Sequence, residues 1–335
     1  MIKNKKILIT GGAGFIGSHL VERLYKSNSI IVFDNFSTGK ITNIEKLKDG
    51  ITLIKGDIIN YTQVLKAIKD VDYIIHQAFP YGVATRDLNK QFIEEGAIGT
   101  FNILRAAVEN NVEKVIYASS VAVYGIQDEL PIKENNLIAP FLPYGATKYV
   151  GELYCKTISN IFNLQTVSLR YFNVYGPRYS SYDHSALINF LTRALKGKDL
   201  IIYGNGEQIR DYTYIDDVVE GTILCLEKDK FYGEVFNIGS GNGIKILDLA
   251  HLVAEIVKEY TKKDINIRFA HEEEYNKVFK GLPRGVTKKI GDKYVDERNY
   301  IADITKAKKI LGYSPKVGLK EGIVKTLEWL LNKND

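Results

Sequence analysis

The stretch KILITGGAGFIGSHLVERLYK, residues 6–26, decides the fold that we expect for this chain. Its apolar, β-branched start predicts a strand, and the apolar residues at helical spacing after Phe15 predict a helix. Between the two, Gly11, Gly14 and Gly17 allow a tight turn, a close approach to a pyrophosphate and close packing of helix on strand. The first amides of such a helix can bind phosphate oxygens. A glycine-rich turn without a chemical role is the alternative, but the strand and the helix on either side favour a dinucleotide site.

The same alternation of short apolar runs and helical patterns continues along the first half of the chain. Continuous apolar strands separated by helices are typical of a parallel sheet that helices cover on both faces. We therefore expect an α/β fold, a doubly wound parallel sheet of the Rossmann type, which binds ligands at the carboxyl ends of its strands. The expected strands are residues 6–10, 29–34, 51–57, 71–78, 112–120 and 234–241, with a further strand followed by a Gly-Pro break in 166–178. The expected helices are residues 15–26, 61–68, 101–110 and 246–260.

The second half of the chain is less regular, and its strand 234–241 predicts a late return to the sheet. This interleaving predicts a smaller C-terminal α/β domain that binds the substrate. Residues 271–298 are charged and hold no clear apolar period, which predicts a long loop or lid. The expected domains are a Rossmann domain of residues 1–176 with a returning segment at about 210–240, and a substrate domain of residues 177–209 and 241–335.

The composition argues against several classes of protein. The 45 basic and 40 acidic residues give a net charge of +5 spread along 335 residues, so there is no basic tail of the kind that binds nucleic acid. Only Cys155 and Cys225 occur, which excludes a disulfide framework and a cysteine-based zinc cluster, and we expect no metal. The apolar run 7–9 is too short for a signal peptide, and no stretch approaches the ~18 apolar residues of a membrane span. We expect a cytoplasmic enzyme.

Two acidic residues follow the strands nearest the glycine loop. Asp34 ends the strand 29–34, where a carboxylate can accept hydrogen bonds from the adenosine ribose and repel a 2′-phosphate, which favours NAD over NADP. Asp57 is placed to reach the adenine. Asp34 could instead be a helix cap or turn former, and Asp57 a turn residue. The residues expected to bind NAD are Gly11, Gly14, Phe15, Ile16, Gly17, Asp34, Asn35, Asp57, Ile58, Gln77, Ala78, Tyr144 and Lys148.

Tyr144 and Lys148 lie four residues apart in a helical pattern, so their side chains share one face. An ammonium beside a phenol stabilises the phenolate and lowers the pKa of the tyrosine from ~10 toward the working pH, which makes Tyr144 a candidate general acid and base. Ser120, at the end of the strand 112–120, could hydrogen-bond the same substrate oxygen. A surface Tyr/Lys pair is the alternative, and the glycine loop together with Ser120 favours proton transfer.

With these residues in place, the chain resembles the extended short-chain dehydrogenase/reductases, and within them the nucleotide-sugar epimerases typified by UDP-galactose 4-epimerase. The resemblance runs from residue 10 to the C-terminus and so covers nearly the whole chain. The matching stretches are TGGAGFIGSHL, FDNFSTG, KGDI, SSVAVYG, YGATK, LRYFNVYGPR, GEQIRDYTYIDDVV, NIGSG and ADITKAKKILGYSP.

The resemblance implies a reaction at C4 of a nucleotide sugar. The tyrosine takes the proton of the 4-hydroxyl while hydride passes to NAD⁺, and the transient 4-keto sugar turns and takes the hydride back on its other face. By motif position, Tyr144 would be the base, Ser120 its hydroxyl partner and Lys148 the cation that tunes it. Lys148 could also hold a ribose hydroxyl of the cofactor.

The resemblance also implies a set of substrate-binding residues. Asn173 matches a pyrophosphate-binding asparagine, and Arg210 matches a phosphate-binding arginine, for which a salt bridge to a neighbouring acid is the alternative. Asp296 falls on an aspartate that contacts the uridine ribose. Lys293 falls where an arginine usually clamps phosphate, and because lysine is a point charge this exchange leaves the nucleotide open. Tyr300 falls at a position whose bulk is associated with excluding N-acetylated sugars, which indicates a plain hexose.

Several positions depart from the family pattern. Phe79 and Pro80 replace the usual His-x-Ala-Ala stretch near the nicotinamide, and Gly96 stands where asparagine is common. Val121 and Ala122 stand directly after the hydroxyl residue, where sugar 4,6-dehydratases carry Asp-Glu. Ala122 also argues against UDP-glucuronate decarboxylases, which place a glutamate in this stretch.

The sequence therefore predicts an NAD-dependent 4-epimerase of a nucleotide-diphosphate sugar of the UDP-glucose/UDP-galactose type. A UDP-glucuronate 4-epimerase, or another nucleotide-sugar epimerase or reductase of the family, is the alternative. A non-catalytic NAD-sensing protein is a remote one, because such proteins tend to lose the Tyr/Lys pair that this chain keeps.

The resemblance further implies a homodimer through helices near residues 89–110 and 144–162. The alternative is that the apolar residues of these helices face the sheet. The candidate contact residues are Ile93, Phe101, Leu104, Val150, Leu153 and Ile161.

Overall fold

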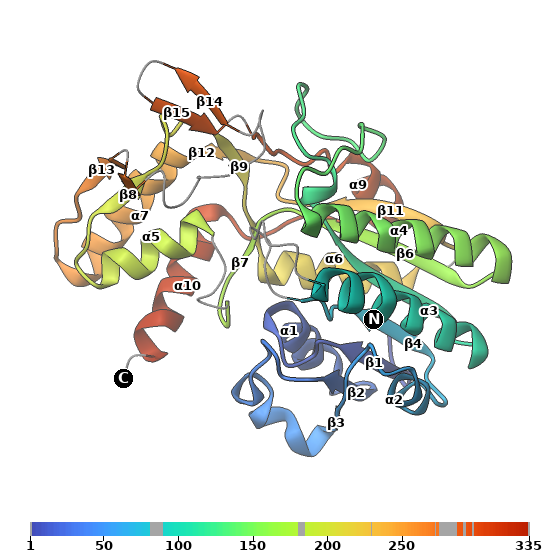
Figure 1. Cartoon of the computed structure of the whole chain (residues 1–335). Coiled ribbons are helices and arrows are strands. Elements are labelled where there is room, and N and C mark those ends of the chain that lie inside the picture. The colour runs from blue at the N-terminus through green and yellow to red at the C-terminus, as the bar shows by residue number, and fades with distance from the viewer. Residues whose placement is uncertain are drawn as a thin grey trace.

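The computed structural model describes residues 2–80, 90–179, 185–228, 230–271, 273–274, 287–290, 293–296 and 298–333. Its main sheet consists of β1 (Lys6–Thr10), β2 (Ser29–Asp34), β3 (Ile51–Lys55), β4 (Tyr73–His76), β5 (Lys114–Ser120), β6 (Gln165–Tyr171) and β11 (Tyr232–Ile238). The strand order is β11-β6-β5-β4-β1-β2-β3, and every neighbouring pair is parallel. Helices cover both faces of the sheet (Figure 1), so the doubly wound α/β fold expected from the sequence is confirmed.

The alternation of side chains along the strands gives the sheet two apolar cores, one on each face. In β1, Ile7 and Ile9 belong to one core and Leu8 to the other, and all three are fully buried. A strand that is buried on both faces has no polar side, which is why these strands read as continuous apolar runs. Residues of α1 (Phe15–Leu24) and α6 (Ile215–Glu227) contribute to the first core, which continues into the C-terminal half of the chain. Residues of α2 (Tyr61–Ala67), α3 (Thr100–Glu109) and α4 (Pro143–Phe162) contribute to the second.

Most of the C-terminal elements gather beside the sheet, on the left in Figure 1, while α9 (Thr305–Leu311) lies beside β11. The short strands form two-stranded pairs, β7–β10, β8–β13, β9–β12 and β14–β15, while β11 returns to the main sheet beside β6. The residue ranges of the two domains stay a prediction. The elements are β7 (Val174–Tyr175), α5 (Ala186–Leu195), β8 (Leu200–Ile202), β9 (Ile209–Asp211), β10 (Thr213–Tyr214), β12 (Gly243–Lys245), α7 (Ile246–Thr261), β13 (Ile267–Phe269), β14 (Thr287–Ile290), β15 (Lys293–Asp296), α9 (Thr305–Leu311) and α10 (Leu319–Lys333).

Local structure differs from the sequence expectation in two places. The strand expected ahead of the Gly-Pro break in 166–178 ends early, at Tyr171, because Asn173 has a φ of +22°, outside the extended region. The next strand, β7, pairs separately with β10. The segment 271–298, expected to be a long loop, contains the antiparallel pair β14–β15. Strands of four residues are too short for an apolar period to stand out, which is why the sequence did not reveal them.

No helix in the described part of the chain is both long and apolar enough to cross a membrane. Within those same residues, no group of three His, Cys, Asp or Glu side chains is placed to hold a metal ion. Cys155 and Cys225 are both buried with free thiols.

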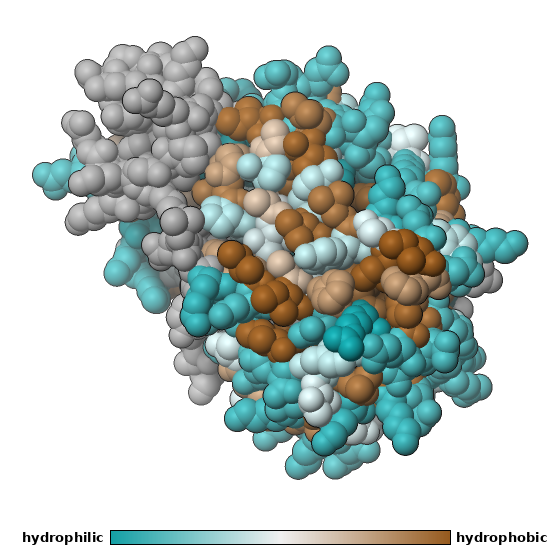
Figure 2. Space-filling view, turned by 45° about the vertical axis from the view of Figure 1, so that its right-hand side comes forward, coloured by the Kyte–Doolittle hydropathy of each residue, from teal (hydrophilic) through white to brown (hydrophobic). Residues whose placement is uncertain are grey.

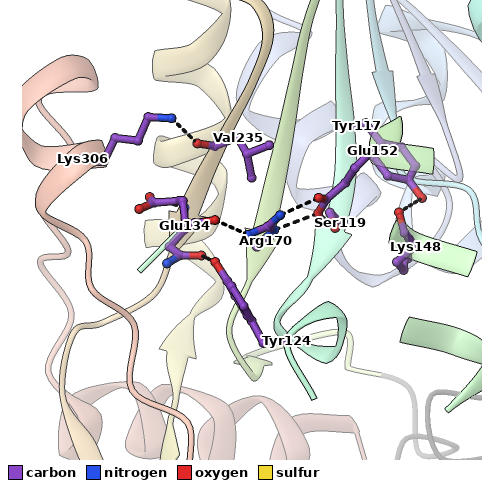
Figure 3. Close-up of polar contacts among 10 residues, drawn as sticks. Tyr117, Ser119, Tyr124, Glu134, Lys148, Glu152, Arg170, Val235 and Lys306 are labelled. Carbon is purple, nitrogen blue, oxygen red and sulfur yellow. Dashed lines mark hydrogen bonds and ion pairs between the residues drawn. The ribbon is translucent and has the colours of Figure 1, made fainter. Parts of the chain in front are cut away.

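A buried ion pair joins α4 to the main sheet. Arg170 of β6 donates to both carboxylate oxygens of Glu152 on α4, at 2.9 Å from Nε and 2.7 Å from Nη2, and both side chains are only 4% exposed. The hydroxyl of Ser119 on β5 donates to the same carboxylate, and Arg170 also donates to the backbone oxygen of Glu134 (Figure 3). Because water cannot reach these charges, the two-pronged contact has to satisfy them within the protein.

We expect Glu152→Gln to lower the free energy of unfolding by about 3–5 kcal/mol, because Arg170 then stays buried without its counter-charge. The paired change Glu152→Leu with Arg170→Met removes both charges and should recover most of that loss. Urea unfolding followed by circular dichroism measures both variants. Equal stability of Glu152→Gln and the wild-type chain would contradict this account of the pair.

Candidate active site

A cleft opens at the carboxyl ends of β1, β2, β4 and β5, where a doubly wound sheet binds its ligands. At the glycine loop, a Cβ on Gly17 would lie 2.1 Å from the backbone oxygen of Gly11. A Cβ on Gly11, whose φ is +66°, would lie 2.8 Å from the backbone nitrogen of Ala78. The loop can therefore hold its path only with glycine at these positions. All of the predicted cofactor residues except Asp57 line the cleft: Gly11, Gly14, Phe15, Ile16, Gly17, Asp34, Asn35, Ile58, Gln77, Ala78, Tyr144 and Lys148.

Asp34 ties the glycine loop to the loop that follows β2. Its Oδ2 accepts from the backbone nitrogen of Ala13 at 2.9 Å, and its Oδ1 accepts from that of Phe36 at 2.8 Å. Burial raises the pKa of this carboxyl, and the two backbone hydrogen bonds act in the opposite direction. The turn-forming role that the sequence left open is thus real, and the same carboxylate also lines the cleft.

Asp57 has a supporting position beside the cleft. Its Oδ1 accepts from the backbone nitrogen of Ile59 at 2.9 Å, and its Oδ2 accepts from Nδ2 of Asn35 at 3.3 Å. Of the two roles weighed from the sequence, the structure shows the turn residue, and Asp57 also orients a cleft residue, Asn35.

The cleft has further lining residues that the sequence reasoning did not single out. Ser37 and Thr38 belong to the quoted FDNFSTG stretch, so the family resemblance could have identified them. Tyr171, whose hydroxyl contacts Thr222 at 2.9 Å and accepts from Gln77 at 3.2 Å, ends a strand and lies in the matching stretch LRYFNVYGPR. The remaining ones are Phe33, Gly56, Glu95, Ala118 and Ser119. Phe79 and Pro80, which the sequence marks as departures from the family pattern, also line the cleft.

A chain of hydrogen bonds through His76 fixes the floor of the cleft. The Thr100 hydroxyl donates to the backbone oxygen of Gly96 at 2.6 Å, so it accepts from Nε2 of His76 at 3.1 Å. That assigns the ring proton to Nε2 and makes Nδ1 the acceptor for the Thr10 hydroxyl at 2.7 Å. The Thr10 oxygen accepts in turn from the backbone nitrogen of Ala78 at 3.2 Å. Each of these groups therefore has a defined donor or acceptor role.

We expect acid to destabilise the fold through His76. Burial, assisted by the charge of Lys148, lowers the pKa of His76 to about 3, against an ordinary value of 6.5. Between these two pH values the unfolded chain binds a proton at His76 and the folded chain does not. The free energy of unfolding should therefore fall by roughly 1.4 kcal/mol for each unit by which the pH is lowered. Urea unfolding at pH 7 and pH 5 should show a smaller pH dependence for His76→Gln. The same dependence in both proteins would contradict the assignment.

Helix α4 brings Tyr144 and Lys148 to the cleft one turn apart. Pro143 opens the helix at a position where no backbone donor is needed. Nζ of Lys148 donates to the backbone oxygen of Ala118 at 2.7 Å and lies 5.8 Å from the centre of the Tyr144 ring. Burial lowers the pKa of Lys148 to about 7, and the Glu152 carboxylate opposes that shift. The backbone of this turn is held as well, since Tyr117 donates to the oxygen of Lys148 at 3.3 Å (Figure 3).

Ser120 lies at the carboxyl end of β5, two residues after the oxygen that holds Lys148. Its hydroxyl oxygen accepts from the backbone nitrogen of Ala122 at 3.2 Å and so caps the short 3₁₀ turn Val121–Val123. The side chain is 9% exposed, and it is the neighbouring Ser119 that lines the cleft.

Three of the predicted substrate residues are brought together around β9. Nδ2 of Asn173 donates to the backbone oxygen of Asp211 at 2.8 Å. The Arg210 guanidinium lies 5.3 Å from the centre of the Tyr300 ring and donates to the backbone oxygens of Ile209, at 3.0 Å, and of Arg298.

The other two predicted substrate residues, Lys293 and Asp296, are the ends of β15. In the pairing with β14, Lys293 lies opposite Ile290 and Asp296 opposite Thr287. Their side chains lie outside the described residues, so their assignment stays a prediction.

Comparison with known proteins identifies the family. A model of the NAD dependent epimerase/dehydratase family matches residues 7–239. The chain belongs to this family. The extended short-chain dehydrogenase/reductase resemblance and the NAD cofactor expected from the sequence are thereby confirmed, and the protein is an enzyme of a family that epimerises or decarboxylates nucleotide sugars.

Relatives within the epimerase/dehydratase family carry out different reactions. The UDP-N-acetyl-α-D-glucosaminuronate decarboxylase of Bacillus cytotoxicus is 34% identical over 337 residues, which cover 97% of each chain. The UDP-N-acetylglucosamine 4-epimerase of Methanobrevibacter ruminantium M1, solved with UDP-N-acetylmuramic acid, has a TM-score of 0.86 at 29% identity, covering 99% of this chain and 100% of that one. The UDP-glucose 4-epimerase of Thermotoga maritima, solved with UDP-glucose, has a TM-score of 0.83 at 32% identity, covering 98% and 100%.

The cleft fits the NAD of the epimerase/dehydratase family on its own geometry. The first turn of α1 has neither an acidic residue nor a side-chain cap, so its amides can bind a pyrophosphate. The crowding at Gly11 and Gly17 excludes any side chain that would cover those amides. The carboxylate of Asp34 stands at the end of the next strand, on the wall of the same cleft.

Proposed function

We propose that the protein is an NAD-dependent 4-epimerase of a nucleotide-diphosphate sugar of the UDP-glucose/UDP-galactose type. The observation that carries this proposal is the pairing of Tyr144 and Lys148 at the cleft with an apolar segment, Val121–Val123, beside them. The pair supplies proton transfer, and the apolar segment offers no second acid or base.

The segment Val121–Val123 packs against the first turn of α4. A Cβ on Gly145, the neighbour of Tyr144, would lie 2.4 Å from the backbone oxygen of Ala122. Val121 is 7% exposed, and methyl groups cannot move protons. Elimination of water from the sugar needs an added acid and base near the tyrosine, so this wall favours epimerisation over dehydration.

NAD would be held along the whole cleft. The amides after Gly14 would bind its pyrophosphate, Asp34 would accept from its adenosine ribose, and Lys148 would donate to its second ribose. When bound, this cofactor supplies a site that accepts a hydride from the sugar carbon and returns it.

The protein's own part in the chemistry is the movement of one proton. Tyr144 would take the proton of the 4-hydroxyl at its phenolic oxygen and give it back after the sugar has turned. The Lys148 ammonium would stabilise the phenolate, and the hydroxyl of Ser120 would orient the sugar oxygen.

The sugar must turn while its nucleotide stays in place, which requires an anchor for the diphosphate. Asn173 and Arg210 would supply it, since they lie on neighbouring segments and both can donate to phosphate oxygens. Tyr300 is 6% exposed beneath the Arg210 guanidinium, where its bulk would favour a plain hexose over an N-acetylated one. We therefore place UDP-glucose and UDP-galactose first among the substrates.

The test is a panel of nucleotide sugars followed by proton NMR, with no cofactor added to the purified protein. We expect UDP-glucose and UDP-galactose to interconvert without a lasting change in absorbance at 340 nm, because the cofactor ends each turnover as it began. A 6-deoxy-4-keto product, or release of carbon dioxide from a uronate, would overturn the proposal. Inversion of UDP-glucuronate alone would instead support the alternative substrate.

We expect Tyr144→Phe to retain bound NAD and the wild-type fold while it lowers kcat at least ~10³-fold, because the phenolic oxygen that moves the proton is gone. Tyr149→Phe is the matched control, since it removes a hydroxyl from the same helix, and it should keep the wild-type rate. Turnover by NMR and cofactor content by absorbance measure the two effects. Undiminished activity of Tyr144→Phe would remove this residue from the mechanism.

We also propose a homodimer through α3, α4 and the π-helix Phe92–Gly99 that precedes α3. Figure 2 brings forward the right-hand side of Figure 1 and shows apolar residues gathered on that face. Leu104 is fully buried in the core and Val150 half-buried, so these two candidates face inward at least in part. The exposed apolar residues of the three helices are Ile93 at 63%, Ile98 at 46%, Phe101 at 42%, Leu153 at 46%, Ile161 at 67% and Phe162 at 56% exposure.

We expect Leu153→Arg to convert the dimer into a monomer, because it places a charge within an apolar contact. Leu137→Arg, at an equally apolar site that is 76% exposed, is the control and should leave the mass unchanged. Analytical ultracentrifugation gives the mass of each species. A monomeric wild-type protein would exclude this interface.

A further inference from the structure

Phe79 and Gly96, two departures from the family pattern, lie in contact with each other. A Cβ built on Gly96 would lie 2.9 Å from Cε2 and 3.0 Å from Cζ of Phe79, and 2.5 Å from Cγ2 of Thr147. No larger residue fits at position 96 while the Thr147 methyl and the Phe79 ring are in place. The two departures therefore form a single packing arrangement.

The Phe79 ring also lies against both members of the Tyr/Lys pair. Nζ of Lys148 is 3.7 Å from the centre of this ring, closer than to the rings of Tyr117, at 5.3 Å, and Tyr144, at 5.8 Å. Tyr144 meets Phe79 edge to face, with ring centres 5.2 Å apart and an angle of 81°. An ammonium that is 4% exposed gains most from the negative face of an aromatic ring, because no water competes for it.

The backbone on both sides of this contact is anchored by the His76 chain. Ala78, which precedes Phe79, donates to Thr10 at one end of the chain, and Gly96 accepts from Thr100 at the other end. Both partners are thus held by the same hydrogen-bonded chain, so a shift of either backbone would weaken these hydrogen bonds.

We propose that Phe79, seated against Gly96, is a positioning residue that holds the Lys148 ammonium beside Tyr144 and stabilises its charged form. The meaning of this role for catalysis rests on the proposed function, in which Lys148 tunes Tyr144. The contact itself can be measured without turnover.

The titratable groups that face Lys148 come from three elements. Glu152 and Tyr144 lie on α4, His76 on β4 and Tyr117 on β5. Glu152 is held in its pair with Arg170, His76 stays neutral above about pH 3, and burial raises the pKa of Tyr117. Tyr144 contacts both Lys148 and Phe79, so all NMR samples carry Tyr144→Phe, which keeps the ring and removes the titrating hydroxyl. In that background, a change in the titration of Lys148 on substitution of Phe79 reports the aromatic contact.

The first experiment follows the lysine ε-carbons by NMR in ¹³C-lysine-labelled, cofactor-free protein, with the Lys148 signal assigned by its loss in Lys148→Arg. Phe79→Leu keeps the apolar bulk and removes the ring, so the titration midpoint should fall by about one pH unit. Phe79→Ala admits water, so the midpoint should rise. Phe79→Tyr, which keeps the ring, and Phe92→Leu, which removes a ring 6.3 Å from that of Phe79, should leave it in place. An unchanged midpoint in Phe79→Leu overturns the proposal.

The second experiment tests the link to Gly96 by titration with NAD. All variants carry Thr147→Ser, which removes the Cγ2 methyl and leaves Phe79 as the contact that an added Cβ would meet first. Gly96→Ala should then push the ring toward the cleft and weaken NAD binding about tenfold, and the further change Phe79→Ala should restore it. An equal loss with and without the Phe79 ring overturns the link.

The aromatic contact and the proposed function can fail independently. A shifted Lys148 midpoint, together with a wild-type protein that epimerises no sugar, would leave the contact standing and remove the proposed function. An active epimerase whose Lys148 midpoint does not change in Phe79→Leu would support the proposed function and exclude the role of Phe79.

Discussion

A buried ammonium must find inside the protein the partners that water would otherwise supply, and Lys148 is such a group. Its partners are the backbone oxygen of Ala118, the face of Phe79 and, one turn along α4, the carboxylate of Glu152. Glu152 is fixed in turn by Arg170 on β6. Since these contacts reach two strands and one loop, they help to fix how α4 lies on the sheet, and with it the position of the Tyr144 side chain.

The C-terminal half contains a buried carboxylate, Asp211, which also needs hydrogen-bond partners within the protein. Asp211 is fully buried, and it accepts from the backbone nitrogens of Ser240, Gly241 and Ala302 at 2.9–3.0 Å. Burial raises its pKa and these hydrogen bonds oppose the rise. The Asp211 carboxylate therefore joins β9 to residues 240–241 and to Ala302, which are distant from it in sequence. Arg210, the residue proposed to bind the diphosphate, precedes Asp211 on β9, so these hydrogen bonds also fix the backbone that carries its guanidinium.

The sequence was most informative where the relevant contacts are local. The glycine loop, the strand ends and the four-residue spacing of Tyr144 and Lys148 all follow from patterns within about 20 residues, and the structure has them in those places. It was least informative where partners meet across the fold. The contact of Phe79 with Gly96, the use of Asp57 to orient Asn35, and the break of the strand at Asn173 depend on neighbours or backbone angles that no local pattern encodes.

The position of β11 has a consequence for how the chain reaches this structure. β11 pairs with β6 and closes one edge of the main sheet, yet it is the last of the seven strands to be synthesised. Until residue 238 has left the ribosome, β6 is an unpaired edge strand whose backbone groups can pair with another chain. A polypeptide that ends near residue 176 lacks β11, so the outer edge of its β6 would stay unpaired. The dinucleotide-binding half is therefore a poor candidate for expression by itself, and its folding has to wait for the synthesis of β11.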